Sequence, residues 1–306
     1  GMSYRWGKWY SRIRLDQTYS APNLTIRDGK AQPEGGGMPV LYLWERSGGL
    51  LLSHVDTVHR VCAFPVNVRP DSTVELALEQ SAEFVHPDSD GRVSGLPVML
   101  GVFGGDYFEA LRAWAGQLRK NGLNFARSPE GSYEPIWCGW GFGNTFTPND
   151  ILKSLPAVKS LEIPVVVVDD GWQASFGRWP LIPEKFPRGE ADMRAMVDSI
   201  HAGGFKAKLW WAPGMLHERD PLYQEHPEWA ILDKDGKPEP AGWGSIYLCP
   251  AYAPVIEQQV GLVRRFMLDW DYDALKMDGD NRNIAPPCSN PAQHQARPKE
   301  AREAQA

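Results

Sequence analysis

The residues best suited to covalent chemistry are the charged side chains of the segment Asp273-Ala-Leu-Lys-Met-Asp-Gly-Asp-Asn281. Side chains alternate between the two faces of a strand, so Lys276, Asp278 and Asp280 are expected to share one face. An ammonium group beside a carboxylate keeps that carboxylate ionised, as a nucleophilic aspartate requires at neutral pH. The alternative is an ordinary surface turn, because Asp and Asn are common in turns.

A second acidic pair follows a strongly apolar run. Residues 163–168 read Ile-Pro-Val-Val-Val-Val, which indicates a strand buried on both faces, and Asp169 and Asp170 come directly after it. Two adjacent carboxylates at the end of a buried strand repel each other and need hydrogen-bond donors. Capping groups or arginines are one source of donors. A ligand with several hydroxyl groups supplies such donors directly, and for that reason the pair is expected to bind such a ligand.

The elements that position these residues alternate between strand and helix after residue 130. Strands are expected at 135–140, 163–168, 205–211 and from 273, with helices between them that include 191–202 and 254–267. This alternation predicts a parallel α/β sheet.

Two features of the same region carry further expectations. Thr147, Pro148 and Asp150 predict the start of a helix that Pro156 should kink or divide. The polar segment that ends near Cys249 is expected to be a loop over the active face.

The first third of the chain has a different pattern. Short apolar runs separated by Gly, Pro and Asp predict a small antiparallel, sandwich-like β domain over 1–105. A helical period over 106–122 predicts a linker helix within 106–130, and the barrel region is assigned to 131–306. His54, Asp56 and His59 favour a hydrogen-bonded strand pair over a metal site. The tail beyond residue 281 has no periodicity.

Composition excludes several classes of protein. The net charge of -6 and the pI near 5.7 disfavour a nucleic-acid-binding surface. No apolar run is long enough to span a bilayer, and the polar start predicts no signal region. The four cysteines form no C-x-x-C pair, so no metal or cofactor is expected and reduced thiols in a cytoplasmic protein are predicted. The 13 tryptophans exceed the needs of a core and suggest some sugar-stacking surfaces, although core packing explains most of them.

Six motifs, by their order and spacing, carry a resemblance to a known family. They are Trp137-Cys-Gly-Trp140, Val168-Asp-Asp-Gly-Trp172, Lys185-Phe-Pro187, Gly204-Phe-Lys-Ala-Lys-Leu-Trp210, His226-Pro-Glu-Trp229 and Leu275-Lys-Met-Asp278. Over residues 137–281 the chain resembles glycoside hydrolase family 36, the α-galactosidases. The resemblance implies a β-sandwich followed by a (β/α)8 TIM-type barrel. It also implies retaining hydrolysis of terminal α-galactosides through a covalent glycosyl-aspartate intermediate.

The resemblance assigns roles to individual residues. Asp278 matches the nucleophile, and Lys276 matches a lysine that binds sugar hydroxyls. Asp169 and Asp170 match the acidic pair that holds the hydroxyls of galactose. The expected substrate is an oligosaccharide or another α-galactoside, and a homo-oligomer is possible.

Further substrate contacts are expected from aromatic residues and from one residue that differs from the usual residue of the family. Trp140 and Trp210 match pocket-wall tryptophans, and Trp172 is taken as a third substrate contact. Asp280 stands where the family usually has Asn, which alters the expected contacts near the second carbon of the sugar.

Two alternatives remain beside the galactosidase hypothesis. One is another α-glycosidase or a raffinose-synthase-like transglycosidase, since Asp-Asp-Gly-Trp-Gln also occurs in that branch of the family. The other is a sugar-binding fragment without turnover, because the motifs cover about the first half of an eight-unit barrel and the family's acid/base aspartate belongs to a later strand.

Overall fold

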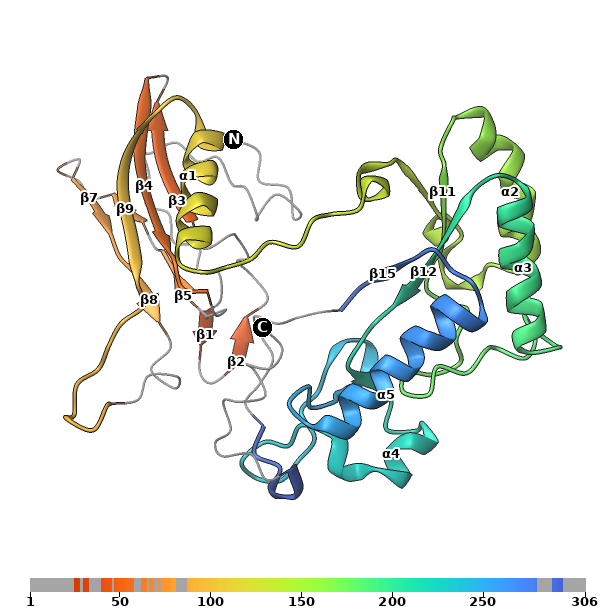
Figure 1. The fold of residues 1–306 in the computed structure, drawn as a ribbon. Helices are drawn as coiled ribbons and strands as arrows, with labels where there is room; N and C mark the ends of the chain where they lie inside the picture. The colour runs from red at the N-terminus through yellow and green to blue at the C-terminus, as the bar shows by residue number, and fades with distance from the viewer. Residues whose placement is uncertain are drawn as a thin grey trace. The chain divides into compact units, whose positions relative to one another are not determined.

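The structure is a computed structural model that describes residues 25–27, 30–32, 40–45, 47–57, 62–64, 66–68, 71, 73–80, 87–279 and 288–293. It forms two compact units, one from Gly1–Ala126 with Ala306 and the other from Arg127–Gln305 (Figure 1). The division falls inside the segment 106–130 that was expected to link two domains.

All strand pairs that the structure describes in the first unit are antiparallel, as the short apolar runs predict. Its main sheet has the order β3-β4-β9, and Leu50 in the middle strand faces Leu43 on one side and Val102 on the other. The strands are β1 (Thr25–Arg27), β2 (Lys30–Gln32), β3 (Val40–Glu45), β4 (Gly48–His54), β5 (Cys62–Ala63), β6 (Val66–Val68), β7 (Val74–Leu76), β8 (Glu79–Gln80) and β9 (Val98–Gly104).

The predicted linker helix is α1 (Tyr107–Lys120), and it packs on the first unit. Asp106 caps it by accepting a hydrogen bond from the backbone N–H of Phe108 at 2.9 Å. The Trp114 indole N–H donates to the His54 carbonyl at 2.9 Å, and the Asn121 amide donates to the Val55 carbonyl at 2.8 Å. These two bonds tie the helix to the end of β4.

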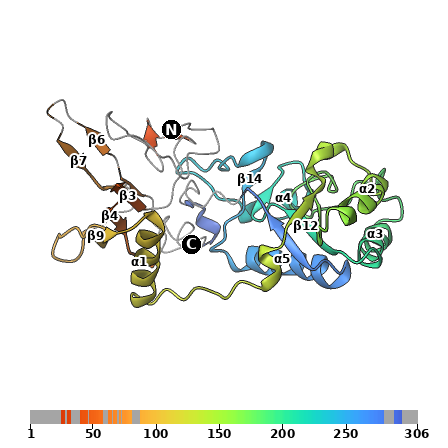
Figure 2. The ribbon, with the colours of Figure 1, turned by 90° about the horizontal axis from the view of Figure 1, so that it is seen from above.

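The second unit is built on a parallel sheet in which every strand pairs with the strand of the same sheet that comes next along the chain. The order is β10-β11-β12-β15, and all three pairings are parallel. Sequential parallel order is the pattern of a barrel, whereas a doubly wound sheet reverses its order. The strands are β10 (Ile136–Cys138), β11 (Val165–Val168), β12 (Lys206–Trp211) and β15 (Ala274–Met277), and the crossover helices are α2 (Pro148–Ser160), α3 (Glu190–Ala202) and α5 (Ala253–Arg264) (Figure 2).

Local sequence signals explain where these elements begin. Thr147 and Asp150 form the predicted capping box, with Thr147 Oγ1 and Asp150 exchanging bonds with each other's backbone N–H groups. The expectation that Pro156 divides this helix is wrong, because α2 runs through it to Ser160. A proline removes one helical hydrogen bond, and the packing of Leu152 and Leu155 against the core holds the helix together across that gap.

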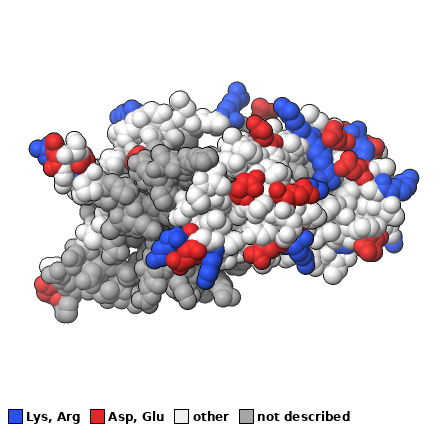
Figure 3. Space-filling view, turned by 90° about the horizontal axis from the view of Figure 1, so that it is seen from below, with Lys and Arg blue, Asp and Glu red and all other residues white. Residues whose placement is uncertain are grey.

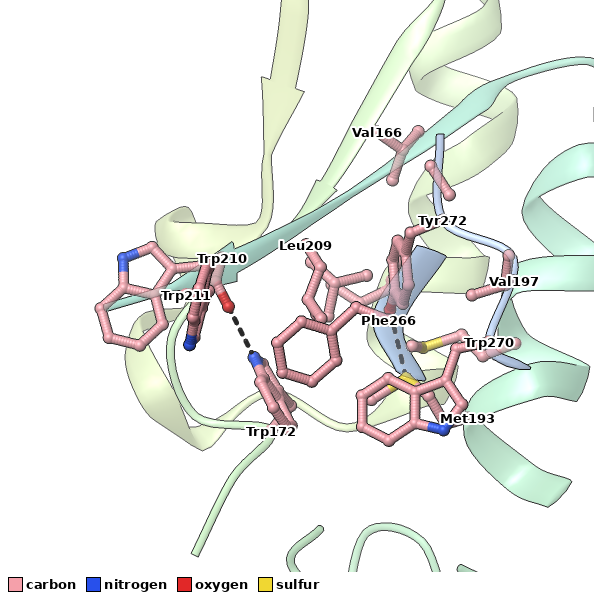
Figure 4. Close-up of a cluster of buried hydrophobic side chains, with 14 of the residues drawn as sticks. Val166, Trp172, Met193, Val197, Leu209, Trp210, Trp211, Phe266, Trp270 and Tyr272 are labelled. Atoms are coloured by element: carbon pink, nitrogen blue, oxygen red, sulfur yellow. Dashed lines mark hydrogen bonds between the residues drawn. The ribbon is translucent and has the colours of Figure 1, made fainter. Parts of the chain in front are cut away.

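The core of the second unit lies between the sheet and its helices and is rich in aromatic rings (Figure 4). Trp172 is fully buried there and packs edge-on against Phe266 and Trp270. Its indole N–H donates to the Trp210 carbonyl at 3.0 Å. Because a buried indole usually needs a partner for its N–H, this bond fixes the loop after β11 against the end of β12.

The segment between β12 and α5 is more structured than the predicted loop. It contains β13 (Met215–Leu216) paired antiparallel with β14 (Ile246–Tyr247), the short helix α4 (Pro221–Glu225) and small cores of its own. Residues 288–293 of the aperiodic tail pack on it, since the Gln293 amide donates to the Glu228 carbonyl at 2.8 Å. Short helical turns are η3 (Glu130–Tyr133), η4 (Gly139–Thr145), η5 (Pro227–Trp229), η6 (Gly242–Gly244), the π-helical η7 (Arg265–Asp269) and η9 (Pro291–Gln293).

Among the described residues of the face shown in Figure 3, Lys and Arg side chains lie between Asp and Glu side chains and form no broad basic region. Among the helices of the described residues, none combines the length and the apolar character needed to cross a bilayer.

Candidate active site

An ion pair between two barrel strands forms the centre of the site. Lys276 Nζ on β15 lies 2.6 Å from Asp169 Oδ2, at the end of β11. The Cys138 thiol, at the end of β10, donates to the same carboxylate oxygen at 2.8 Å, and Lys276 Nζ lies 3.8 Å from Cys138 Sγ. The carboxyl ends of parallel strands meet at one edge of the sheet, so three strands contribute to one cluster.

Burial and charge determine the protonation of this cluster. Partial burial by itself lowers the pKa of Lys276, but the hydrogen bond and charge of Asp169, with the charge of Asp278, outweigh it and raise that pKa. Burial and the hydrogen bond to Asp169 raise the pKa of Cys138. The cluster therefore holds an ammonium group and a protonated thiol at neutral pH.

The two adjacent aspartates are in different environments. Asp169 is 2% exposed, and its Oδ1 accepts the backbone N–H of Asp170 at 2.9 Å, so both of its oxygens are engaged. Asp170 is half-buried, and its Oδ1 accepts a bond from the Gln173 amide at 2.5 Å. Among the described residues, Oδ2 of Asp170 has no hydrogen-bond partner. Asp170 is therefore the member of the pair with an oxygen open to a ligand.

Asp278 is exposed just past the end of β15 and is held by neutral donors. Its Oδ2 accepts the indole N–H of Trp210 at 3.0 Å, and its Oδ1 accepts the backbone N–H of Gly279 at 2.7 Å. Its own backbone N–H donates to the Trp211 carbonyl at 2.9 Å, which continues the β12–β15 pairing by one residue. An exposed carboxylate with a fixed orientation is suited to attack an electrophilic carbon.

The three tryptophans that the sequence analysis expects to contact the substrate differ in their exposure to solvent. Trp140 is 53% exposed and presents its ring to solvent. Trp210 is 2% exposed and packs against the tilted rings of Phe176 and Trp179, and it reaches the site through its indole N–H. Trp172 is fully buried, so its assignment as a substrate contact is corrected to a core role. Asp280 lies outside the described residues.

Sequence reasoning did not assign a role to Cys138 or Trp243, and the structure brings both to the site. Cys138 bonds the buried Asp169, and its position at the end of a strand was the signal that it would lie there. Trp243, in the Gly-Trp-Gly of η6, packs on Trp210 with ring centroids 6.0 Å apart. In the part of the chain that the structure describes, no group of three or more His, Cys, Asp or Glu side chains could hold a metal ion, and His59 is not among those residues.

A family model covers the whole of this site. Residues 135–305, more than half of the chain, match the model of the family described as Melibiase. The chain belongs to the melibiase family. Membership confirms the family that the motif order predicted.

The curated relatives are longer than this chain. An A type blood α-D-galactosamine galactosaminidase from Flavonifractor plautii is 30% identical over 295 residues, which cover 91% of this chain and 26% of that protein. A bifunctional α-galactosidase/sucrose kinase from Mediterraneibacter gnavus is 33% identical over 100 residues, or 30% of this chain and 10% of that protein. The chain thus spans about a quarter of the length of the Flavonifractor relative.

Solved structures with a similar fold include two bacterial α-galactosidases. The enzyme from Thermus thermophilus, in complex with p-nitrophenyl α-D-galactopyranoside, is 26% identical with a TM-score of 0.62, and the match covers 96% of this chain and 57% of that one. AgaA from Geobacillus stearothermophilus, a family 36 enzyme, is 18% identical with a TM-score of 0.58, and the match covers 80% of this chain and 35% of AgaA. The fold is the predicted TIM-type barrel, of which four strands are described, preceded by a small β domain.

Proposed function

We propose that this chain carries the nucleophile and the sugar-binding groups of a retaining glycosidase for terminal α-galactosides. The observation that carries the proposal is the exposed carboxylate of Asp278, oriented by Trp210 and placed beside the Lys276–Asp169 ion pair at the carboxyl ends of the strands. A carboxylate that attacks an anomeric carbon needs a fixed orientation, and the Asp278 oxygens accept two hydrogen bonds, from the Trp210 indole N–H and the Gly279 backbone N–H.

In the proposed reaction, an Asp278 oxygen forms a bond to the anomeric carbon as the bond to the leaving oxygen breaks. The leaving oxygen takes a proton from a second carboxyl group, and water then releases the sugar from the aspartyl ester. Asp170 accepts a hydrogen bond from a galactose hydroxyl through its open Oδ2. Lys276 donates to another hydroxyl, and Asp169 orients Lys276.

The relatives support the same class of substrate. Several are named α-galactosidases, and the Thermus enzyme has been solved with p-nitrophenyl α-D-galactopyranoside and with stachyose. The Flavonifractor relative, whose match covers 91% of this chain, is named for α-D-galactosamine. An α-linked galactosamine is therefore the second candidate substrate.

Covalent trapping tests the nucleophile. A fluorinated α-galactosyl fluoride has a leaving group that needs no protonation, so the test does not depend on the acid. We expect mass spectrometry to find the sugar on the peptide that contains Asp278, and no labelling of D278N. Labelling that persists in D278N would overturn the assignment, and an unlabelled chain that still binds galactose would support a binding role alone.

Calorimetry with galactose and with galactosamine distinguishes the two candidate substrates. D170N is expected to weaken binding of the preferred sugar by about tenfold, because a hydrogen bond to a charged group contributes about 1.5 kcal/mol. D198N, an exposed carboxylate on α3, serves as the matched control and is expected to leave binding unchanged.

A further inference from the structure

Trp243 is an exposed aromatic residue in a conformation that favours glycine. It is 56% exposed, and its backbone has φ 56° and ψ 35°, in the left-handed region. Side chains with a Cβ seldom occupy that region, and residues held there cluster at ligand-binding and active sites.

The backbone around Trp243 is firmly held. The Ala241 N–H donates to the Ser245 carbonyl at 2.7 Å, and the Ser245 N–H donates to the Gly242 carbonyl at 3.2 Å. The ring of His217 also hydrogen-bonds the Trp243 backbone and stacks on Phe176 with centroids 4.3 Å apart. The turn is thus fixed on both sides while more than half of the Trp243 surface faces solvent.

The Trp243 indole lies against the residues that hold Asp278. It packs edge-on against Trp210, the donor to Asp278 Oδ2, and against Phe176 with centroids 6.1 Å apart. It also lies close to Gly279, since a Cβ added there would be 2.7 Å from Trp243 Cζ3. Gly279 directly follows Asp278. An exposed indole therefore stands at the rim of the site, next to the carboxylate that would attack.

We propose that Trp243 is an aromatic platform for the leaving group of the substrate, a second sugar ring or an aryl ring joined to galactose. The proposal rests on the proposed function. The polar groups for sugar hydroxyls come from β11 and β15, whereas Trp243 comes from the segment after β13 and presents an apolar surface. Apolar faces of rings stack on exposed indoles, and the buried Trp210 has no face left for this.

The test compares two probes, galactose and p-nitrophenyl α-galactopyranoside, by calorimetry on the full chain in a D278N background that prevents turnover. W243N removes the ring and keeps a residue that tolerates the left-handed backbone. It is expected to weaken binding of the aryl galactoside by about tenfold and that of galactose by less than about twofold. W243F should retain most of the affinity.

Y133A, which removes an aromatic ring that is 82% exposed on η3, is the matched control and should change neither affinity. Equal losses for both probes in W243N would place the ring at galactose itself and overturn the proposal, as would the absence of any loss. A parent chain that binds neither probe would instead refute the proposed function, and the platform with it. Thermal unfolding of W243N and W243F confirms that each variant is folded.

Discussion

At the scale of single residues, Lys276 balances the buried charge of Asp169. K276M keeps the aliphatic length and removes the ammonium group, which leaves the Asp169 carboxylate with only the Cys138 thiol and a backbone N–H. We expect a loss of about 2 to 3 kcal/mol in the free energy of unfolding, below the range for fully buried pairs because the Lys276 side chain is 33% exposed.

Urea unfolding of K276M, D169N and the double variant checks this expectation. The double variant should be more stable than K276M, because it removes the uncompensated charge. Equal stabilities of K276M and the parent chain would show that the pair contributes nothing to folding.

His217 predicts a pH dependence of stability. Its Nδ1 accepts the backbone N–H of Phe176 at 3.1 Å. Burial, followed by the charge of Arg219, lowers its pKa below the ordinary 6.5, whereas the hydrogen bond to the Trp243 backbone and the charge of Asp220 act in the opposite direction. Below pH 6.5 His217 binds a proton in the unfolded chain but not in the folded chain. The free energy of unfolding therefore decreases as the pH is lowered from 6.5, until the pH reaches the pKa of His217 in the folded chain.

H217F keeps the stack on Phe176 and cannot titrate. Its loss of stability between about pH 7.5 and about pH 5 should be smaller than that of the parent chain, as measured by urea unfolding. Identical losses in the two proteins would assign the acid sensitivity to carboxylates elsewhere.

At the scale of elements, the exit of β11 is fixed by Gly171. Its φ is +109°, and an added Cβ would lie 2.4 Å from the carbonyl oxygen of Asn144 and 2.6 Å from its Cα. Lys185 Nζ holds the two segments together by donating to the carbonyls of Gly171 and Asn144 at 2.7 and 2.8 Å. Because backbone atoms cannot move aside cheaply, the turn that presents Asp170 depends on this glycine.

G171A is therefore expected to lower the free energy of unfolding by about 2 kcal/mol or more and to weaken sugar binding at least about tenfold. G141A is the matched control, since no atom lies within 4 Å of its added Cβ and its φ is outside the left-handed region. Thermal unfolding and calorimetry measure both effects. Similar behaviour of the two variants would contradict the prediction.

At the scale of the whole molecule, the parallel sheet has outer edges at β10 and β15 without a further strand among the described residues. Apolar side chains are exposed on the neighbouring elements, including Ile256 at 49% and Val260 at 45% on one face of α5, and Met277 at 60%. Unpaired strand edges and apolar patches promote association. The 306-residue chain alone is expected to self-associate with rising concentration.

Sedimentation velocity over a range of concentrations measures this association. The double variant I256K/V260K should shift the distribution towards monomer, whereas L161K, at a leucine that is 66% exposed at the end of α2, should not. A monodisperse parent monomer at every concentration would show that these surfaces do not mediate self-association.

The sequence by itself determined the features that depend on near neighbours. The capping box at Thr147, the apolar run of β11 and the helical stripe of α3 each lie within a short segment, so periodicity and cap chemistry were sufficient to predict them. Motif order was sufficient for the family. The failures at Pro156 and in the segment after β12 arose where packing with distant residues stabilised a structure that local propensity disfavours.

The tertiary structure decided which of several similar residues serves the site. Asp169 and Asp170 are neighbours with the same side chain, and only burial distinguishes the partner of Lys276 from the carboxylate with an open oxygen. Trp172 and Trp243 are likewise alike in sequence, yet one is in the core and the other is exposed beside Asp278. The Lys276–Asp169 contact joins residues 107 positions apart, and no local pattern encodes such a pair because parallel strands bring together residues separated by whole βα units.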